Sequence, residues 1–193
     1  MFVFRAARFS HSRMRLLDLF LAFSVLVCCP GAAFPLEKTS GGDLELQVKA
    51  AYLYNFTKFV YWSRSGSDDK TGEITIAVIG ADSIRDLLEG FSKNGGGDRP
   101  IVVQSVNAGQ ATAPACHLLF IGRHEQSQWP ALSKRLAGTD ILTVSDIPGF
   151  ARQGGMIGLF IENDRVGIEI NMDRVRRAGL KISAKLLEIA RIL

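Results

Sequence analysis

The last forty residues, Gly154 to Leu193, constrain the fold of this chain most strongly. Apolar residues occupy both alternate sets of positions from Met156 to Ile161, which predicts a strand covered on both faces. Arg165 to Ile170 instead alternates apolar residues with polar or small ones, as expected for a strand with one face in the core. Between them, Glu162-Asn163-Asp164 supplies residue types that tolerate a tight turn. The pattern predicts an antiparallel hairpin.

Strand and helix patterns alternate through the rest of the chain. An apolar, aromatic stripe predicts a largely buried helix from Asp43, its cap, to Trp62. The other expected elements are strand 74–79, helix 82–92, strands 101–106 and 117–121, helix 127–137, strand 141–144, a short helix capped by Ser145-Asp146 that carries Phe150, a helical turn from Asn171 to Arg177, and a last helix capped by Ser183 with Leu186, Ile189, Ala190 and Leu193 on one face. The class is α/β: a single domain with a central, mostly parallel sheet flanked by helices and a C-terminal antiparallel hairpin.

The N-terminus has the pattern of a secretory signal. Four arginines precede an apolar run from Leu16 to Cys29, and Gly31-Ala32-Ala33 provides the small residues of a cleavage site. We therefore expect a signal peptide over residues 1–33, a flexible leader over 34–43 and the folded domain over 44–193. Met14 is an alternative start. The predicted location of the exported protein is the periplasm.

Removing the signal changes the charge and the cysteine count. The signal contains four arginines and one aspartate, which leaves 19 basic and 18 acidic residues in the exported chain. A nearly neutral domain lacks the basic surface that nucleic-acid binding needs, so no nucleic-acid partner is expected. Two of the three cysteines leave as well, and Cys116 alone cannot form an internal disulfide.

No residue pattern indicates catalysis. Cys116 and His117 are neighbours on a predicted strand, so their side chains point to opposite faces and cannot cooperate as nucleophile and base. A buried thiol and a strand-end imidazole are the simpler interpretation. His117 and His124, without a companion cluster, do not make a metal site. The prediction is a protein that is not an enzyme and that uses no metal and no cofactor.

Partner binding is more compatible with the C-terminal region. The candidate contact residues are Phe150, Glu169, Arg174, Arg176 and Arg177. An exposed aromatic beside arginines has the composition of a protein–protein hot spot. The expectation is that Phe150 is exposed and that Glu169 points outward. A core phenylalanine beside a solvated helix start is the other interpretation, and the sequence leaves both open.

Four blocks of sequence carry a family resemblance. VKAAYLYNFTKFVYW, CHLLFIG, SDIPGFARQGGMIGLF and EINMDRVRRAGLKISAKLLEIARIL, in this order, resemble the YfiR family over residues 44–193. The resemblance implies a small periplasmic α/β protein without enzymatic activity. It differs from the well-studied type in one respect, because that type has disulfides and the exported chain here has only Cys116.

The resemblance also implies partners. The repressor of this family binds the periplasmic domain of a membrane diguanylate cyclase (YfiN-like), and an OmpA-like outer-membrane lipoprotein (YfiB-like) relieves the repression. The implied output is cyclic di-GMP, and through it biofilm formation and motility. Homodimerisation stays open. The alternative function is a periplasmic small-molecule-binding sensor component of another signalling system, supported if Tyr52 or Trp62 lines a cavity rather than the core.

Overall fold

The computed structural model describes residues 41–62, 72–94, 99–109 and 116–193. All of them belong to one compact unit, Thr39–Leu193. The predicted signal peptide, residues 1–33, and residues 34–40 of the predicted leader lie outside the described residues.

The described residues alternate between helices and strands, as the sequence predicts. In chain order the elements are α1 (Gly41–Phe59), β1 (Val60–Trp62), β2 (Ile74–Ile79), α2 (Asp82–Asn94), β3 (Ile101–Ser105), β4 (Leu118–Ile121), the 3-10 helix η1 (Arg123–Gln128), α3 (Trp129–Arg135), β5 (Leu142–Ser145), β6 (Ile157–Glu162), β7 (Arg165–Ile170), α4 (Met172–Arg177), β8 (Leu180–Ile182), α5 (Ala184–Leu187) and β9 (Arg191–Ile192).

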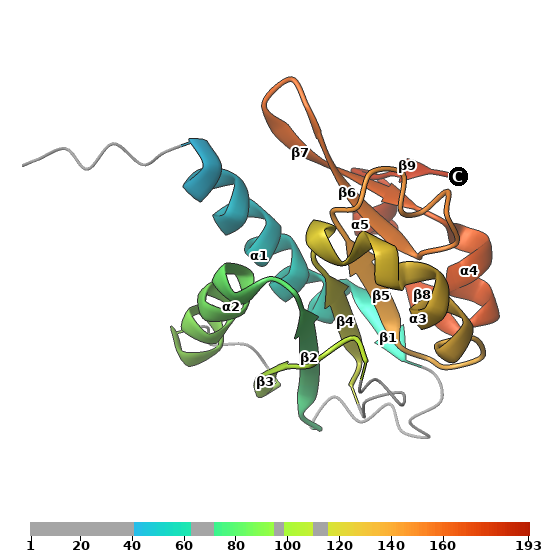
Figure 1. Cartoon of the computed structure of the whole chain (residues 1–193), viewed down its shortest axis with the longest axis horizontal. Helices are drawn as coiled ribbons and strands as arrows, with labels where there is room; N and C mark the ends of the chain where they lie inside the picture. Colours follow the sequence, from blue (N-terminus) through green and yellow to red (C-terminus); the bar gives the residue numbers. More distant parts are fainter. Residues whose placement is uncertain (1–40, 63–71, 95–98, 110–115) are drawn as a thin grey trace, which may run out of the picture. The chain divides into compact units, whose positions relative to one another are not determined.

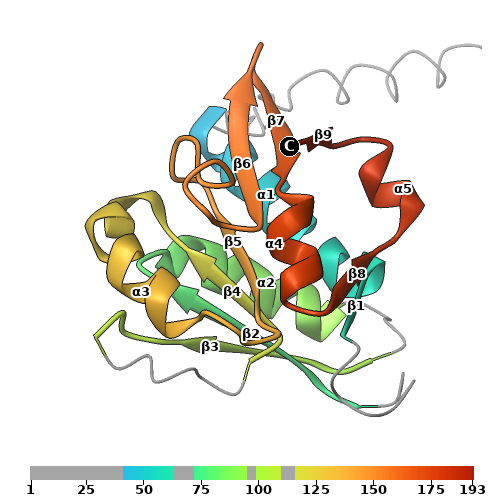
Figure 2. The same ribbon diagram turned by 90° about the vertical axis from the view of Figure 1, so that its right-hand side faces the viewer.

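A seven-stranded sheet in the order β3-β2-β4-β5-β6-β7-β9 organises the unit. The five strands from β3 to β6 run parallel, and β7 is antiparallel to β6. Figures 1 and 2 show α1 and α2 on one side of this sheet and α3 on the other. The predicted mixed α/β class with a mostly parallel sheet and an antiparallel hairpin is confirmed.

Side-chain alternation along the central strands builds two apolar clusters. Ile74, Ile76 and Val78 of β2 face the larger cluster, which holds the buried residues of α1 and α2. Ala77 and Ile79 of the same strand face the smaller cluster, which holds Trp129 and Leu132 of α3. Because successive strand residues point to opposite faces, one continuous apolar strand serves both layers.

The hairpin forms at the predicted turn. Asn163 and Asp164 both have positive φ, 51° and 58°. Two consecutive left-handed residues make a type I′ turn, whose twist suits a two-residue hairpin. The expectation that Met156 to Ile161 is covered on both faces holds only for its first part, since Ile161 is 42% exposed. The strand runs past the core before it turns.

Two helix predictions fail at their C-terminal ends. The predicted helix over 43–62 begins at Gly41 and ends at Phe59, because residues Val60–Trp62 pair as strand β1 with β8. The predicted last helix ends at Leu187, and Arg191–Ile192 instead pairs in parallel with Glu169–Ile170 of β7. In each case the edge of another strand supplies backbone partners that override the local helical pattern.

The predicted short helix around Phe150 is also wrong. Residues 148–154 form consecutive turns between β5 and β6. The Ser145 hydroxyl accepts a hydrogen bond from the backbone N–H of Ile147 at 2.9 Å, so Ser145 starts a local turn rather than a helix. The predicted cap at Asn171 is confirmed, because its side-chain oxygen accepts from the Arg174 N–H at 3.1 Å.

Candidate partner-binding surfaces

Phe150 lies in the core, so the expectation that it is exposed is wrong. Its side chain is 0% exposed and packs in the smaller apolar cluster. The ring lies 4.4 Å from the ring of Trp129, centroid to centroid, at 51°. The turns after β5 fold back on α3, which places the aromatic ring between the sheet and that helix.

Glu169 is buried as well, so it does not point outward as expected. Its side chain shares a sheet face with Gly158 and Arg191, its partners on β6 and β9. Arg152, from the turns after β5, covers it with an ion pair of 2.7 Å. Through this ion pair, Glu169 holds the turns that contain Arg152 and Phe150 against the sheet.

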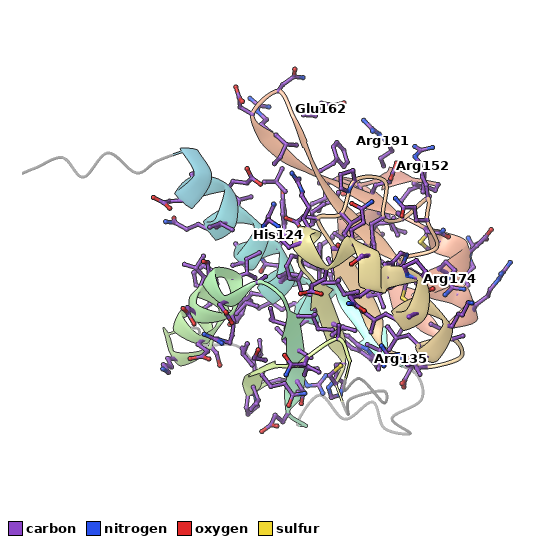
Figure 3. All side chains as sticks on the ribbon, in the orientation of Figure 1. His124, Arg135, Arg152, Glu162, Arg174 and Arg191 are labelled. Atoms are coloured by element: carbon purple, nitrogen blue, oxygen red, sulfur yellow. The ribbon has the colours of Figure 1, made fainter. Side chains whose placement is uncertain are left out.

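The α4 arginines remain at the surface. Arg176 and Arg177 are exposed, and Arg176 has a loose ion pair with Asp173 at 3.6 Å. Arg174 is half-buried, and its Nε has no hydrogen-bond partner among the residues that the structure describes. Figure 3 shows Arg174 well away from Glu162 and Arg191 at the hairpin. Because Phe150 and Glu169 are buried, they do not form one exposed patch with the α4 arginines, and partner contact by those arginines stays a prediction.

A second surface, absent from the sequence prediction, lies on the hairpin. We define the hairpin groove as a depression of about 600 Å³ lined by Phe160, Glu162, Asn163, Arg165, Val166, Gly167, Ile168, Ile189 and Arg191. Phe160 stands opposite Gly167 in the β6–β7 register, and its ring lies over that glycine. On the ring lies the guanidinium of Arg191, 4.7 Å from its centroid. Figure 3 shows Glu162, which pairs with Arg191 at 3.3 Å, at the hairpin tip.

Exposed apolar side chains are concentrated in the hairpin and the C-terminal residues, and one of them, Ile189, lines the hairpin groove. Seven large apolar side chains are exposed among the described residues, and four of them lie on β6 or the last five residues: Ile161, Ile189, Ile192 and Leu193. The most exposed is Ile189, at 64%. An exposed apolar side chain such as Ile189 beside a charged rim is typical of a protein-binding site. The hairpin groove is therefore the strongest candidate for partner contact.

The sequence could have indicated part of this groove. A two-residue turn at Asn163-Asp164 fixes the hairpin register, and that register places Phe160 opposite Gly167. Ile189 gave no such signal, since its spacing from Leu186 fits a helical core face. Its exposure follows from the early end of α5, which no local pattern predicts.

Cys116 and His117 serve the structure of the sheet. Burial raises the pKa of Cys116 to about 12. Burial first, and then the nearby charge of Arg99, lowers the pKa of His117. The His117 Nδ1 accepts a hydrogen bond from the Thr75 N–H at 3.1 Å, which fixes the ring against β2. A protonated thiol and a neutral, hydrogen-bonded imidazole are not a nucleophile and its base.

The thiol should therefore be inert in the folded protein. We expect Ellman's reagent at mildly alkaline pH to modify Cys116 only after denaturation, because the thiolate is the reactive form and both burial and the raised pKa suppress it. Denatured protein, measured in parallel, should react rapidly and with one thiol per exported chain. Fast reaction in the native state would contradict this assignment and reopen a cysteine-based activity.

The aromatic helix packs into the core rather than around a ligand. Tyr52 stacks on Phe56, with ring centroids 6.2 Å apart at 7°. Trp62 donates from its indole N–H to the His117 carbonyl at 3.0 Å and meets the His117 ring edge to face. Neither residue lines the hairpin groove. The alternative of a small-molecule sensor, which depends on one of these residues lining a cavity, stays a prediction.

Two further properties concern the described residues as a whole. None of their helices is long and apolar enough to cross a bilayer. They contain no group of three or more His, Cys, Asp or Glu side chains placed to hold a metal ion.

Comparison with known proteins identifies a family and a fold. A family model described as YfiR/HmsC-like matches residues 46–191. A solved structure from Streptococcus pneumoniae, described as an ABC domain in complex with L-Trp, is similar with a TM-score of 0.54 at 9% identity over 77% of this chain and 60% of that one. A conserved domain protein from Vibrio cholerae has a TM-score of 0.50 at 10% identity over 76% and 59%.

At these identities the two solved structures are evidence for the fold alone. This chain spans about 60% of each of them. The family match covers the same residues as the resemblance found in the sequence, apart from a few at either end.

Proposed function

This chain belongs to the YfiR/HmsC-like family, and on that premise we propose that it binds and represses a membrane-anchored diguanylate cyclase. The family is one of periplasmic, non-catalytic regulatory domains, and membership suggests regulation of diguanylate cyclase signalling. The proposed repression lowers cyclic di-GMP and thereby limits biofilm formation and favours motility. Its target is the periplasmic domain of the cyclase.

The observation that carries the proposal is the apolar surface around the hairpin groove. Ile189 and the half-buried Phe160 offer apolar contact, while Arg165, Arg191 and Glu162 form a charged rim. This is the composition of an interface core with a polar edge. The hairpin also projects beyond the rest of the sheet, as Figures 1 and 2 show, so it is accessible to a large partner.

Repression would follow from differential binding. If the domain binds the inactive arrangement of the cyclase more tightly than the active one, it shifts the population toward the inactive state. An OmpA-like lipoprotein that competes with the cyclase for this repressor would remove the repressor and restore cyclase activity. Reciprocal linkage then requires that each partner weakens the binding of the other.

Direct binding tests the proposal. We expect the purified exported chain to bind the purified periplasmic domain of the diguanylate cyclase encoded in the same genome, measured by isothermal titration calorimetry. An OmpA-like lipoprotein domain added in excess should reduce that binding. A cyclase domain that gives no saturable heat with this protein would argue against the proposal.

The α4 arginines are proposed to contribute long-range charge rather than close contact. The double variant Arg176→Glu/Arg177→Glu should lower the affinity for the cyclase domain by about tenfold at low ionic strength. Because both side chains are exposed, most of the loss should lie in the association rate and should shrink as salt is added. Stopped-flow or surface-plasmon-resonance kinetics would measure it.

Two results separate this proposal from its alternatives. Unchanged association in Arg176→Glu/Arg177→Glu would remove α4 from the interface. A large, salt-independent increase in dissociation rate would instead place these arginines in the buried contact. Lys181→Glu, an exposed substitution on the neighbouring strand β8, serves as the charge-reversal control.

A further inference from the structure

A half-buried histidine just before β4 joins two sheets. The main sheet has seven strands, while β1 and β8 form a separate two-stranded sheet. The carbonyl oxygen of His117 accepts hydrogen bonds from the Leu142 N–H of β5 at 2.9 Å and from the Trp62 indole N–H of β1 at 3.0 Å. The His117 backbone N–H donates to the Thr75 carbonyl oxygen of β2 at 2.9 Å. This one residue therefore couples the small sheet to the large one.

The imidazole ring of His117 completes this joint. Its Nδ1 accepts a hydrogen bond from the Thr75 backbone N–H at 3.1 Å. The ring also meets the Trp62 ring edge to face, with centroids 5.6 Å apart at 89°. An imidazole nitrogen that accepts a hydrogen bond carries no proton, so the neutral ring has its proton on Nε2. The bond to β2 therefore depends on the neutral form of His117.

A proton on Nδ1 is incompatible with this arrangement. The charged imidazole donates from both of its nitrogens, so the new Nδ1–H would face the Thr75 N–H, which is also a donor. Two donors that face each other repel, and the Thr75 N–H would lose its acceptor. The ring would have to turn away from β2. Because Trp62 packs against the ring, such a movement would disturb the contact that holds β1.

The charges around the ring leave a net preference for its neutral form. Burial and the nearby cation of Arg99, before β3, lower the pKa of His117. The carboxylates of Asp140, before β5, and Glu73, before β2, raise that pKa, but the net shift is downward. The neighbouring thiol of Cys116 adds no charge, because burial raises its pKa to about 12. Geometry and charge in the described part of the chain thus favour the same protonation state.

We propose that His117 is an acid-operated latch between the two sheets. The uncharged ring bonds Thr75 and supports Trp62, which holds β1 against the main sheet. A proton on Nδ1 breaks the Thr75 bond, and β1 loosens together with β8, with which it pairs over three residues. Only Ala178 and Gly179 separate β8 from α4, so the loosening reaches the surface that carries the α4 arginines. The latch gives the protein a pH input that does not presuppose any partner.

The direction of the pH effect follows from the lowered pKa of His117. In an unfolded chain a histidine takes up its proton at about pH 6.5, before the folded protein does. The unfolded state then binds more protons than the folded state, so the stability falls as the pH falls. The contribution of the neutral ring is fully present above about pH 6.5 and is lost as the pH passes through the lower pKa of the folded state.

NMR spectroscopy of the exported chain tests the latch without any substitution. The His117 ring nitrogens should show the Nε2–H tautomer at neutral pH and should protonate below about pH 6.5. As the ring becomes charged, hydrogen exchange at the Thr75 amide and the Trp62 indole N–H should accelerate by about tenfold or more relative to the β6–β7 amides, after correction for intrinsic exchange. Protonation at or above about pH 6.5, unchanged relative protection at Thr75, or equal acceleration in β6–β7 would overturn the proposal.

Two matched variants assign the pH effect to one histidine. His117→Asn places an amide oxygen near the position of Nδ1, where it can accept from the Thr75 N–H but cannot take up a proton. Its urea midpoint should fall less than that of the unaltered protein between about pH 7.5 and about pH 5. His124→Asn removes the exposed histidine of η1 and should retain the full pH dependence. An equal fall in His117→Asn and in the unaltered protein would assign the acid sensitivity to other groups and overturn the proposal.

Discussion

Phe150→Ala is expected to lower the free energy of unfolding by about 4 kcal/mol, in the middle of the range for a buried aromatic truncation. The side chain is fully buried, its ring packs on Trp129, and it lies so close to Gly155 that a Cβ there would overlap it. Removing the ring leaves a cavity between the sheet and α3 that neighbouring turns cannot readily fill. Urea denaturation, followed by tryptophan fluorescence or circular dichroism, would measure the loss.

Phe160→Ala provides the matched control. Phe160 is only half-buried, on the hairpin, so its truncation should cost about 1 kcal/mol. The same Phe→Ala substitution is therefore expected to cost much more stability at the core position, Phe150, than at the surface position, Phe160. If Phe150→Ala folded with nearly unchanged stability and lost only its cyclase partner, Phe150 would be a contact residue after all, and the core assignment would be wrong.

Ile189→Glu is expected to weaken binding to the cyclase domain by at least about 2 kcal/mol, or roughly thirtyfold. Ile189 is 64% exposed and lies in the hairpin groove, so a partner that covers it would have to bury an unpaired carboxylate. The same exposure means that folding should be unaffected, within about 0.5 kcal/mol. Calorimetric titration against the cyclase domain, with a urea melt in parallel, would measure both quantities.

Val102→Glu is the control for this prediction. Val102 is also an exposed apolar residue, at 41%, but it lies on β3 at the opposite edge of the sheet. The Val102→Glu variant should bind the cyclase domain with the same affinity as the unaltered protein. Equal losses in Ile189→Glu and Val102→Glu would show a general effect of added charge, and normal binding by Ile189→Glu would move the interface away from the hairpin groove.

The sequence predicted correctly those features that are set by residues close together in the chain. Strand β2 is bounded as predicted, and the turn at Asn163-Asp164 has the conformation that its residue types favour. Asn171 caps α4 because the capping bond spans only three residues. Such features depend on local geometry, which the sequence contains.

Features that depend on long-range pairing were missed. Residues 60–62 continue the apolar pattern of α1, yet β8 pairs with them from far along the chain. The final residues look helical, yet the edge of β7 takes them as β9. Phe150 stands in a polar, glycine-flanked segment that looks exposed, and only the position of α3 explains its burial. The expected exposure of Phe150 and Glu169 was wrong for the same reason, whereas partner contact by the α4 arginines stays a prediction.

The measurement that tests the central claim most directly is cellular cyclic di-GMP in a strain that lacks this gene. The account predicts that cyclic di-GMP rises on deletion and returns to its original level when an export-competent copy is restored, but not when the copy lacks residues 1–33. An unchanged level on deletion, or restoration by the copy that is not exported, would contradict repression of a diguanylate cyclase from the periplasm.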